Sequence, residues 1–309
     1  MSAWPSPTYA ALSHSDAIAS LIEHGRPWLG VVHSEFRSVL NIATEGALIA
    51  VAAPSAGRLP NGVAADMGPD FRRLGIRAGM VVEHGPGTLS IDEAGVVIDL
   101  SRTEAWSPRL APPTGGTTES VRRWRARASA IRRLAATVAA GRAEAGRGLG
   151  PLVGPWPDGS GGDLADRARP VMSGLRKAVR DRNGEAAATM ARALIGLGPG
   201  LTPSGDDALV GVAAACRALG SPISGFLADA LVDVDARTTT IAASYLRHAG
   251  RGEFAERIHV LLADLLGSDV SRIEPVIRAF VDWGATSGTD CLVGVLLGLD
   301  AVADTGAAA

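Results

Sequence analysis

Acidic and hydroxyl side chains gather in one glycine-rich stretch, residues 196–211, which reads GLGPGLTPSGDDALVG. Gly198, Gly200 and Gly205 permit positive φ and close backbone approach, while the two prolines hold φ near turn values. The small and apolar residues that follow are typical of a buried helix, so the loop should end at a helix N-terminus. Amides at such an end bind anions, and paired carboxylates there could hold a cation or a donor group of a substrate.

The same pattern occurs again near the C-terminus. Residues 204–211, SGDDALVG, and residues 287–294, SGTDCLVG, differ at two positions. One interpretation is a pair of capping boxes, in which each serine is an N-cap and the aspartate three residues later bonds back to it. Capping leaves the GLGPGLTP lead-in, the additional Asp206 and the hydroxyl of Thr289 unexplained. The functional interpretation is a ligand-binding loop.

A third group of hydroxyls precedes another predicted helix. Thr238 and Thr239 stand where this helix should begin, and Ser244 follows about one turn later. Successive β-branched residues suit a cap or an entering loop better than a helix interior. The functional interpretation is a third hydroxyl-bearing helix end that converges with the other two. His248 and Arg251 are weaker candidates, because a helix C-terminus favours basic residues for dipole reasons alone.

These patterns give two sets of candidate residues. The candidate catalytic residues are Asp206, Asp207 and Asp290. The candidate substrate-binding or anion-binding residues are Gly198, Gly200, Thr202, Ser204, Gly205, Thr238, Thr239, Ser244, Ser287, Gly288 and Thr289. The sequence contains no recognisable Ser-His-Asp set, H-E-x-x-H motif or Cys-His metal spacing, so positioning and electrostatics would carry catalysis. We expect no cofactor, with Mg²⁺ on the aspartates as the alternative.

The composition indicates a globular protein without a general attraction to nucleic acid or membrane. The chain has 309 residues, 47% of them hydrophobic, a formal net charge of −2 and a pI near 6.3. Cys216 and Cys291 lie in apolar helical patterns and are expected to be reduced core residues. Neither a signal peptide nor a membrane-spanning run is recognisable, which favours a cytoplasmic location.

The periodicity divides the chain into two parts. Residues 13–24 are predicted to form an opening helix, and short apolar runs separated by turn residues then continue to about residue 108. This α+β organisation predicts a β-rich N-terminal domain, a small barrel or sandwich, over residues 1–110, and a mostly α-helical domain over residues 118–309. The histidine of the first strand, His33, is interpreted as an ordinary strand residue.

Helical patterns fill the second part. Predicted helices span residues 118–141, 163–180, 184–195, 204–219, 222–233, 238–249, 252–267, 271–283 and 288–301. The first of them carries six arginines around Trp124, a pattern also found in nucleic-acid contacts. A solvated or partner-facing surface is the favoured interpretation, because the protein as a whole is mildly acidic.

Several of these motifs resemble the AllH family. The resemblance rests on GLGPGLTPSGDD at residues 196–207, on the element from Thr238 through Ser244 to Gly250, and on residues 287–294; Phe36, Asn41 and Pro60-Asn61 also fit. It implies a subunit of bacterial oxamate carbamoyltransferase that works with two other proteins in anaerobic, allantoin-type purine catabolism. The implied reaction converts carbamoyl oxamate and phosphate into oxamate and carbamoyl phosphate.

Two classes of function follow from the residues and the resemblance. The first is an enzyme subunit that binds a small anionic substrate at the 196–207 loop, with partner subunits and without nucleic acid or membrane. The second is a noncatalytic scaffold or small-anion-binding subunit in which the loops only cap and pack helices. A Mg²⁺-dependent hydrolase is a third possibility.

Overall fold

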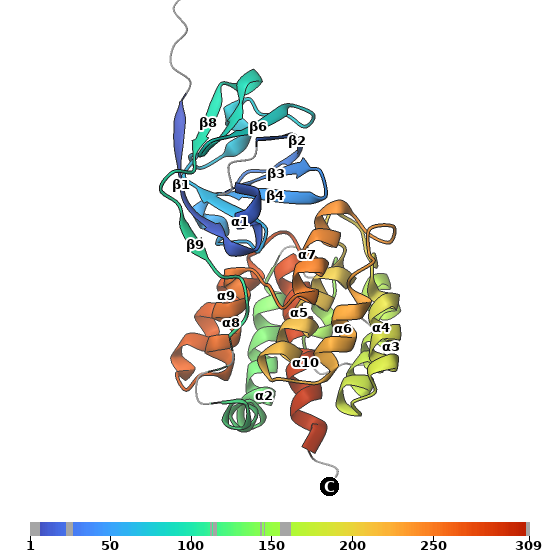
Figure 1. Ribbon diagram of the computed structural model, residues 1–309. Helices are drawn as coiled ribbons and strands as arrows, with labels where there is room; N and C mark the ends of the chain where they lie inside the picture. Colours follow the sequence, from blue (N-terminus) through green and yellow to red (C-terminus); the bar gives the residue numbers. More distant parts are fainter. Residues whose placement is uncertain are drawn as a thin grey trace, which may run out of the picture. The chain divides into compact units, whose positions relative to one another are not determined.

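The computed structural model describes residues 7–22, 27–111, 113, 116–142, 144, 146–154 and 162–306. The chain forms two compact units, Met1–Pro108 and Arg109–Ala309. The first is made of strands and the second of helices (Figure 1).

The first unit is a closed barrel, one of the two predicted architectures. Its described strands are β1 (Thr8–Ser15), β2 (Trp28–Glu35), β3 (Val39–Thr44), β4 (Ala47–Ala52), β5 (Gly62–Ala65), β6 (Val81–Gly85), β7 (Thr88–Ile91), β8 (Val96–Asp99) and β9 (Glu104–Trp106). They pair in the order β5-β4-β3-β2-β6-β7-β8-β1-β9, and β1 also pairs with β5. The β1–β5 pairing closes the first eight strands of this order, so that β9 alone extends beyond the ring along β1. Closure removes the exposed edges that an open sheet would have.

The barrel interior follows from alternation along the strands. Leu40 and Ile42 of β3, Ile49 and Val51 of β4, and Phe71 belong to one buried apolar cluster. Because successive side chains of a strand point to opposite faces, the residues between them point away from this core.

The predicted opening helix over residues 13–24 is wrong. Residues 8–15 form β1, followed by a 3₁₀ turn (Asp16–Ile18) and a single helical turn, α1 (Ala19–Ile22). Ser13 and Ser15 pair with Glu104 and Trp106 of β9, so long-range strand pairing outweighs the local helical pattern. Ser15 does act as a cap, accepting a 3.2 Å hydrogen bond from the Ala17 amide.

The second unit is helical, and the described helices lie close to their predicted ranges. They are α2 (Thr117–Ala140), α3 (Asp163–Arg180), α4 (Gly184–Leu194), α5 (Ser204–Ala218), α6 (Ile223–Ala230), α7 (Thr240–Gly250), α8 (Glu256–Leu266), α9 (Ile273–Val281) and α10 (Ser287–Ala303). Part of the glycine-rich segment 146–162 lies outside the described residues; Gly150–Leu152 within it form a 3₁₀ turn.

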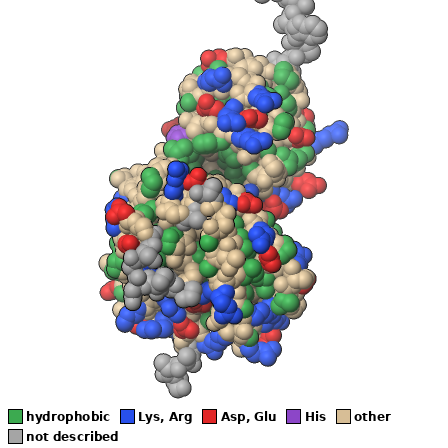
Figure 2. Space-filling view, turned by 180° about the vertical axis from the view of Figure 1, so that it is seen from behind, with side chains coloured by type: hydrophobic (Ala, Val, Ile, Leu, Met, Phe, Trp, Pro, Cys, Tyr) green, Lys and Arg blue, Asp and Glu red, His purple; other side chains and the backbone are tan. Residues whose placement is uncertain are grey.

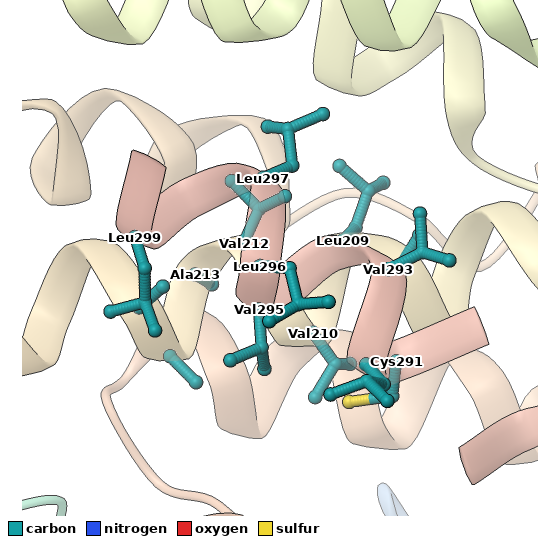
Figure 3. Packing of buried hydrophobic residues seen from close by; sticks show 14 of the residues in the cluster. Leu209, Val210, Val212, Ala213, Cys291, Val293, Val295, Leu296, Leu297 and Leu299 are labelled. Atoms are coloured by element: carbon teal, nitrogen blue, oxygen red, sulfur yellow. The ribbon is translucent and has the colours of Figure 1, made fainter. Parts of the chain in front are cut away.

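Helices α5 and α10 form the centre of this unit. Nearly every residue of both is buried, and their apolar side chains interleave (Figure 3). A Cβ atom on Gly211 would overlap the carbonyl oxygen of Cys291, and one on Gly294 would overlap that of Ala208. Glycine is therefore required at these positions because the two backbones are in direct contact. Cys216 and Cys291, as predicted, are free and buried in these helices.

The arginines of α2 mostly bind the protein itself. Arg125 and Arg127 donate to the carbonyl oxygens of Ala303 and Gly267, at the ends of α10 and α8. Arg132 pairs with Asp300, which also accepts a 2.9 Å hydrogen bond from the buried indole of Trp124. The predicted solvated or partner-facing surface is thus partly wrong: Arg125 and Arg127 neutralise the carbonyl ends of two helices, where positive charge is stabilising.

Positive and negative side chains are interspersed over the face of the molecule seen in Figure 2. In the described part of the chain, no helix is long and apolar enough to cross a membrane.

Candidate functional site

Asp206 holds the lead-in loop in place. Its Oδ1 atom accepts a 2.9 Å hydrogen bond from the Gly196 amide, and its Oδ2 atom accepts one from the Thr238 hydroxyl. The side chain is 2% exposed, and burial raises the pKa of its carboxyl group, against the effect of these hydrogen bonds. Asp206 therefore joins the start of the loop to the segment that precedes α7.

The serines of the two repeated motifs are not N-caps. The N-cap positions are Pro203 and Thr286, and neither side chain makes a cap hydrogen bond. The serine hydroxyls instead lie beside the aspartate of the other motif: Ser204 lies close enough to Asp290, and Ser287 close enough to Asp207, to lower the pKa of that carboxyl group. The capping-box interpretation is wrong, because the serine of each motif caps no helix and lies beside the aspartate of the other motif.

This reciprocal pairing fixes how α5 and α10 lie. Ser204 meets Asp290 just as Ser287 meets Asp207, and Gly211 meets Cys291 just as Gly294 meets Ala208. Contacts of equivalent residues near both N-termini require two helices that run side by side in the same direction. The two repeated segments are thus related by an approximate twofold arrangement, with their polar ends together.

Asp207 and Asp290 are buried at this shared polar end, where they are 7% and 0% exposed. Burial raises the pKa of the Asp207 carboxyl group well above its usual value, and the charge of Asp290 raises it further. Burial also raises the pKa of Asp290, although the Leu149 amide and the Ser204 and Thr286 hydroxyls oppose this. Two helix N-termini on one side favour negative charge there and offset part of the cost of burial.

Each of these two carboxyl groups keeps one oxygen without a partner. Oδ2 of Asp207 and Oδ2 of Asp290 accept no hydrogen bond from the described residues. Buried polar atoms normally have partners, so each of these oxygens indicates a position for a guest: a proton, a water molecule, a cation or a donor group of a ligand.

Asp290 also faces the glycine-rich segment before α3. The Leu149 amide donates a 2.5 Å hydrogen bond to Asp290 Oδ1, and Gly148 lies so close that a Cβ there would overlap the same carboxyl group. A cavity of about 10 Å³ lies between this carboxyl group and its neighbours Arg142, Glu144, Gly150, Ala285, Thr286 and Thr289. That volume holds about one water molecule, so this cavity is too small for a larger ligand.

The hydroxyls before α7 and in the lead-in loop lie on the other side. Thr202 and Ser287 share a 2.9 Å hydrogen bond beside Asp207. Thr239 caps α7, as predicted, by accepting a 3.2 Å hydrogen bond from Ala242, and its hydroxyl donates to the Leu201 carbonyl oxygen. Thr202 and Thr239 are both partly exposed.

The remaining predicted residues shape the backbone. The amides of Gly205 and Gly288 donate to the carbonyl oxygens of Leu197 and Trp283, at 2.8 and 2.9 Å. The amides of Asp206 and Asp207 both donate to Pro203. The expectation of unpaired first-turn amides is wrong for these four, because the tight loops before both helices supply their acceptors. Gly198 packs against Ser204, Gly200 is exposed, and Ser244 is buried in α7.

Tyr245, Arg257 and Trp283 were not predicted from the sequence. Burial is the main reason that the pKa of Tyr245 rises to about 12. The charge of the Asp207 carboxylate adds to this rise, and the Arg257 cation opposes it. The Arg257 guanidinium stacks over the Trp283 ring, 5.0 Å from its centroid. Isolated Tyr, Arg and Trp residues carry no motif; only the position of Tyr245 directly after Ser244 could have indicated its role.

Other candidates lie elsewhere. His248 binds Glu253 at 2.8 Å, and Arg251 binds the same carboxylate at 3.1 Å, so these two form an ion-pair group of their own. In the barrel, Asn41 donates to the Ser34 hydroxyl at 3.1 Å and Asn61 donates to the Leu48 carbonyl at 2.9 Å, both consistent with roles in strand geometry. His33 bonds Ser34, as expected for an ordinary strand residue.

A larger cavity, of about 410 Å³, lies away from the repeated motifs. Apolar residues of α8 and of the segment before α2 line most of it, together with Arg123 and His259. Its size suits a small ligand, and among the described residues its polar lining is Arg123, His259 and Ser268, without an acidic side chain.

Comparison with known proteins agrees with the two-part organisation. A family model described as oxamate carbamoyltransferase subunit AllH matches residues 194–299, which include both repeated motifs, and a model for the AllH family N-terminal domain matches residues 10–105. No solved structure matches this chain. With matches in both units that together cover well over half of its length, the chain belongs to the AllH family.

Proposed function

We propose that this chain is a subunit of an oxamate carbamoyltransferase that handles the carbamoyl group at the shared polar end of α5 and α10. The observation that carries the proposal is the pair of buried carboxyl oxygens, Asp207 Oδ2 and Asp290 Oδ2, that lack protein partners. The family description supports a carbamoyltransferase subunit and hence partner subunits. A role in allantoin-type purine catabolism belongs to the same proposal.

The chemistry suits a pair of coupled carboxyl groups. A phosphate oxygen attacks the carbamoyl carbon of carbamoyl oxamate, the bond from that carbon to the oxamate nitrogen breaks, and the proton of hydrogenphosphate ends on that nitrogen. The products are carbamoyl phosphate and oxamate. Repulsion between Asp207 and Asp290 favours one shared proton, so that one group can accept a proton while the other donates. Asp206 contributes by holding the loop.

Carbamoyl transfer by the complex reconstituted with its partner subunits tests this proposal. Asp207→Asn and Asp290→Asn should each lower kcat about 100-fold, or about 2.7 kcal/mol, the usual size of one acid-base contribution. Asp233→Asn, which removes an exposed carboxylate, should leave the rate unchanged. Unchanged rates in the Asp207, Asp290 and Asp206→Asn variants would count decisively against a catalytic site here.

A noncatalytic scaffold or small-anion-binding subunit is the second candidate. It is favoured by the occupied first-turn amides and by Asp206, both of whose oxygens bind protein groups. Titration of the melting temperature with carbamoyl phosphate, phosphate and oxamate separates the candidates, because a ligand of the native state must raise it. A flat response to all three favours the scaffold.

Mg²⁺ enters as an alternative cofactor for a hydrolase or for the transfer itself. In the described part of the chain, no three His, Cys, Asp or Glu side chains come together as a metal site. Mg²⁺ nevertheless often binds one or two carboxylates together with a substrate phosphate, and Asp207 and Asp290 could supply these. Activity that EDTA abolishes and Mg²⁺ restores would establish the metal.

A further inference from the structure

We infer that the cavity of about 410 Å³ beside α2 and α8 is a second binding site, which takes an apolar molecule with one carboxylate group. Ala218, the last residue of α5, is part of its wall, whereas Asp207 stands in the first turn of the same helix. The two sites therefore lie at opposite ends of α5. The inference goes beyond the proposed function and does not depend on it.

Apolar side chains form most of the cavity wall. Leu262 and Leu266 of α8, both buried, line it together with Leu110 and its neighbours before α2. This segment is fixed, because the Leu110 amide donates a 3.0 Å hydrogen bond to the Gly252 carbonyl oxygen. A preformed pocket with apolar walls and few polar groups is typical of small-molecule sites. At about 30 Å³ for each water-sized atom, the volume accepts a ligand of about a dozen non-hydrogen atoms.

Arg123 of α2 provides a positive charge in this wall. Its Nε atom donates to Glu119 at 2.9 Å, and its Nη1 atom donates to the Leu266 carbonyl oxygen at 3.3 Å. These two hydrogen bonds hold the guanidinium in place. Among the described residues, none accepts a hydrogen bond from its Nη2 atom, which is therefore available to a ligand.

The charge around the cavity is not balanced by nearby carboxylates. Glu119 pairs with Arg122 as well as with Arg123, so one carboxylate serves two cations. Asp264 of α8 pairs with Arg272 at 2.9 Å. A ligand carboxylate thus meets a cation with charge to spare, and a guanidinium forms strong charge-assisted hydrogen bonds with such a group.

The remaining wall decides the class of anion. One arginine among mostly apolar side chains favours a single charge, because the second charge of a phosphate would be desolvated there without a partner. The apolar part of the ligand then covers the leucines of the wall and gains the free energy of removing their surface from water.

Naphthalene-2-carboxylate and naphthalene-2-carboxamide test the inference, because they share size and shape and differ in charge. Their affinities for the full chain are measured by isothermal titration calorimetry, first for the chain alone and then for the complex reconstituted with its partner subunits. The wild-type chain should bind the carboxylate about 10-fold more tightly than the amide, as expected for a hydrogen bond to a charged group.

Substitutions separate the charge from the walls. Arg123→Met should bind both probes equally, and Arg123→Lys should retain part of the preference for the carboxylate. Arg122→Met is the matched control, because Arg122 binds the same Glu119 but is exposed and does not line the cavity. Ala263→Phe, at an exposed position of α8 that lines the cavity, should block both probes, whereas Val260→Phe, exposed on the same helix outside the cavity, should block neither.

Three results overturn the inference: equal binding of the two probes by the wild type, an unchanged preference in Arg123→Met, or no binding of either probe. Loss of carboxylate binding when the partner subunits are added also overturns it, because the pocket would then be a contact between subunits. Carbamoyl transfer is not measured in these titrations, so this inference and the proposed function can fail separately.

Discussion

The two repeated segments of the helical unit agree where they meet and differ where they face their own surroundings. Each begins a buried helix with Ser-Gly-x-Asp, and each serine pairs with the aspartate of the other segment. At the third position, Asp206 of the first segment binds Gly196 and Thr238, whereas Thr289 of the second lines the cavity beside Arg142. The difference teaches that the shared residues serve the junction and the differing ones serve local anchoring.

The largest effect is expected where the two backbones touch. Gly211→Val should destabilise the helical unit by about 3 kcal/mol, because its side chain would push against the Cys291 carbonyl oxygen and separate α5 from α10. In a unit of this size the melting temperature should fall by about 10 °C, measurable by calorimetry. Gly294→Val should have a similar effect, since it pushes against the Ala208 carbonyl oxygen.

A glycine of α6 provides the control for this pair. A Cβ atom on Gly225 would meet no other atom within 4 Å. Gly225→Ala should therefore be neutral or stabilising by about 0.5 kcal/mol, through the unfolded chain. If Gly211→Val and Gly294→Val lower the stability by widely different amounts, the twofold relation between the two segments does not extend to their contributions to stability.

The second effect concerns the buried charges and depends on pH. Burial raises the pKa of Asp207 in the folded protein, so the folded state holds this proton more tightly than the unfolded chain. The resulting stability is fully present below the unfolded pKa, near 4, and is lost as pH rises through the folded value. Asp207→Asn should thus be more stable than the wild type by about 2 kcal/mol at pH 8, and this difference should vanish towards pH 4.

Urea unfolding of wild type, Asp207→Asn and Asp290→Asn across this pH range provides the measurement. Asp233→Asn controls for the change of net charge, since Asp233 is exposed. Each buried carboxylate increases the free-energy cost of ionising the other. The double variant should therefore gain less stability than the sum of the gains of the single variants. A difference in the free energy of unfolding between Asp207→Asn and wild type that does not change with pH would contradict the raised pKa of Asp207.

The sequence predicted much of this arrangement, and the misses have physical causes. The internal similarity of residues 204–211 and 287–294 correctly located both helix starts, because the motif and the helical pattern are local. It could not show that Ser204 serves Asp290, since a capping box and a reciprocal pair use the same letters. Arg257 and Trp283 escaped notice because their meeting depends on the packing of α8 against the loop before α10.

The barrel shows the same limit. Alternating apolar runs predicted most strands. Strand β1 was missed, and its residues 13–15 were assigned to a helix, because its pairing partners lie far along the chain, in β5, β8 and β9. The choice between barrel and sandwich likewise depended on the single β1–β5 pairing that closes the sheet.

The third expected effect concerns the hydroxyls of Ser204 and Ser287, each of which lies beside the aspartate of the other segment. Ser204→Ala and Ser287→Ala should each cost about 1.5 kcal/mol, because each hydroxyl stabilises the charged form of the aspartate beside it. The loss should appear in urea unfolding at pH 8 and shrink towards pH 4, where the carboxyl groups are protonated in both variants. In a double-variant cycle, Ser204→Ala should couple to Asp290→Asn and not to Asp207→Asn. Coupling of Ser204→Ala to Asp207→Asn instead would support the capping-box interpretation.

The smallest expected effect distinguishes the loop before the first segment from the loop before the second. Thr239 caps α7 and also donates to the Leu201 carbonyl oxygen, so it ties α7 to the loop of the first segment. Thr239→Ala should cost about 1 kcal/mol, as for the loss of a helix cap. Hydrogen exchange should also become faster in residues 198–202 but not in residues 284–288, which lead into the second segment. Thr240→Ala, at an exposed position one residue later, should change neither the stability nor the exchange. Equal acceleration in both loops after Thr239→Ala would mean that the segments open together, as one cooperative unit joined by the Thr202–Ser287 hydrogen bond.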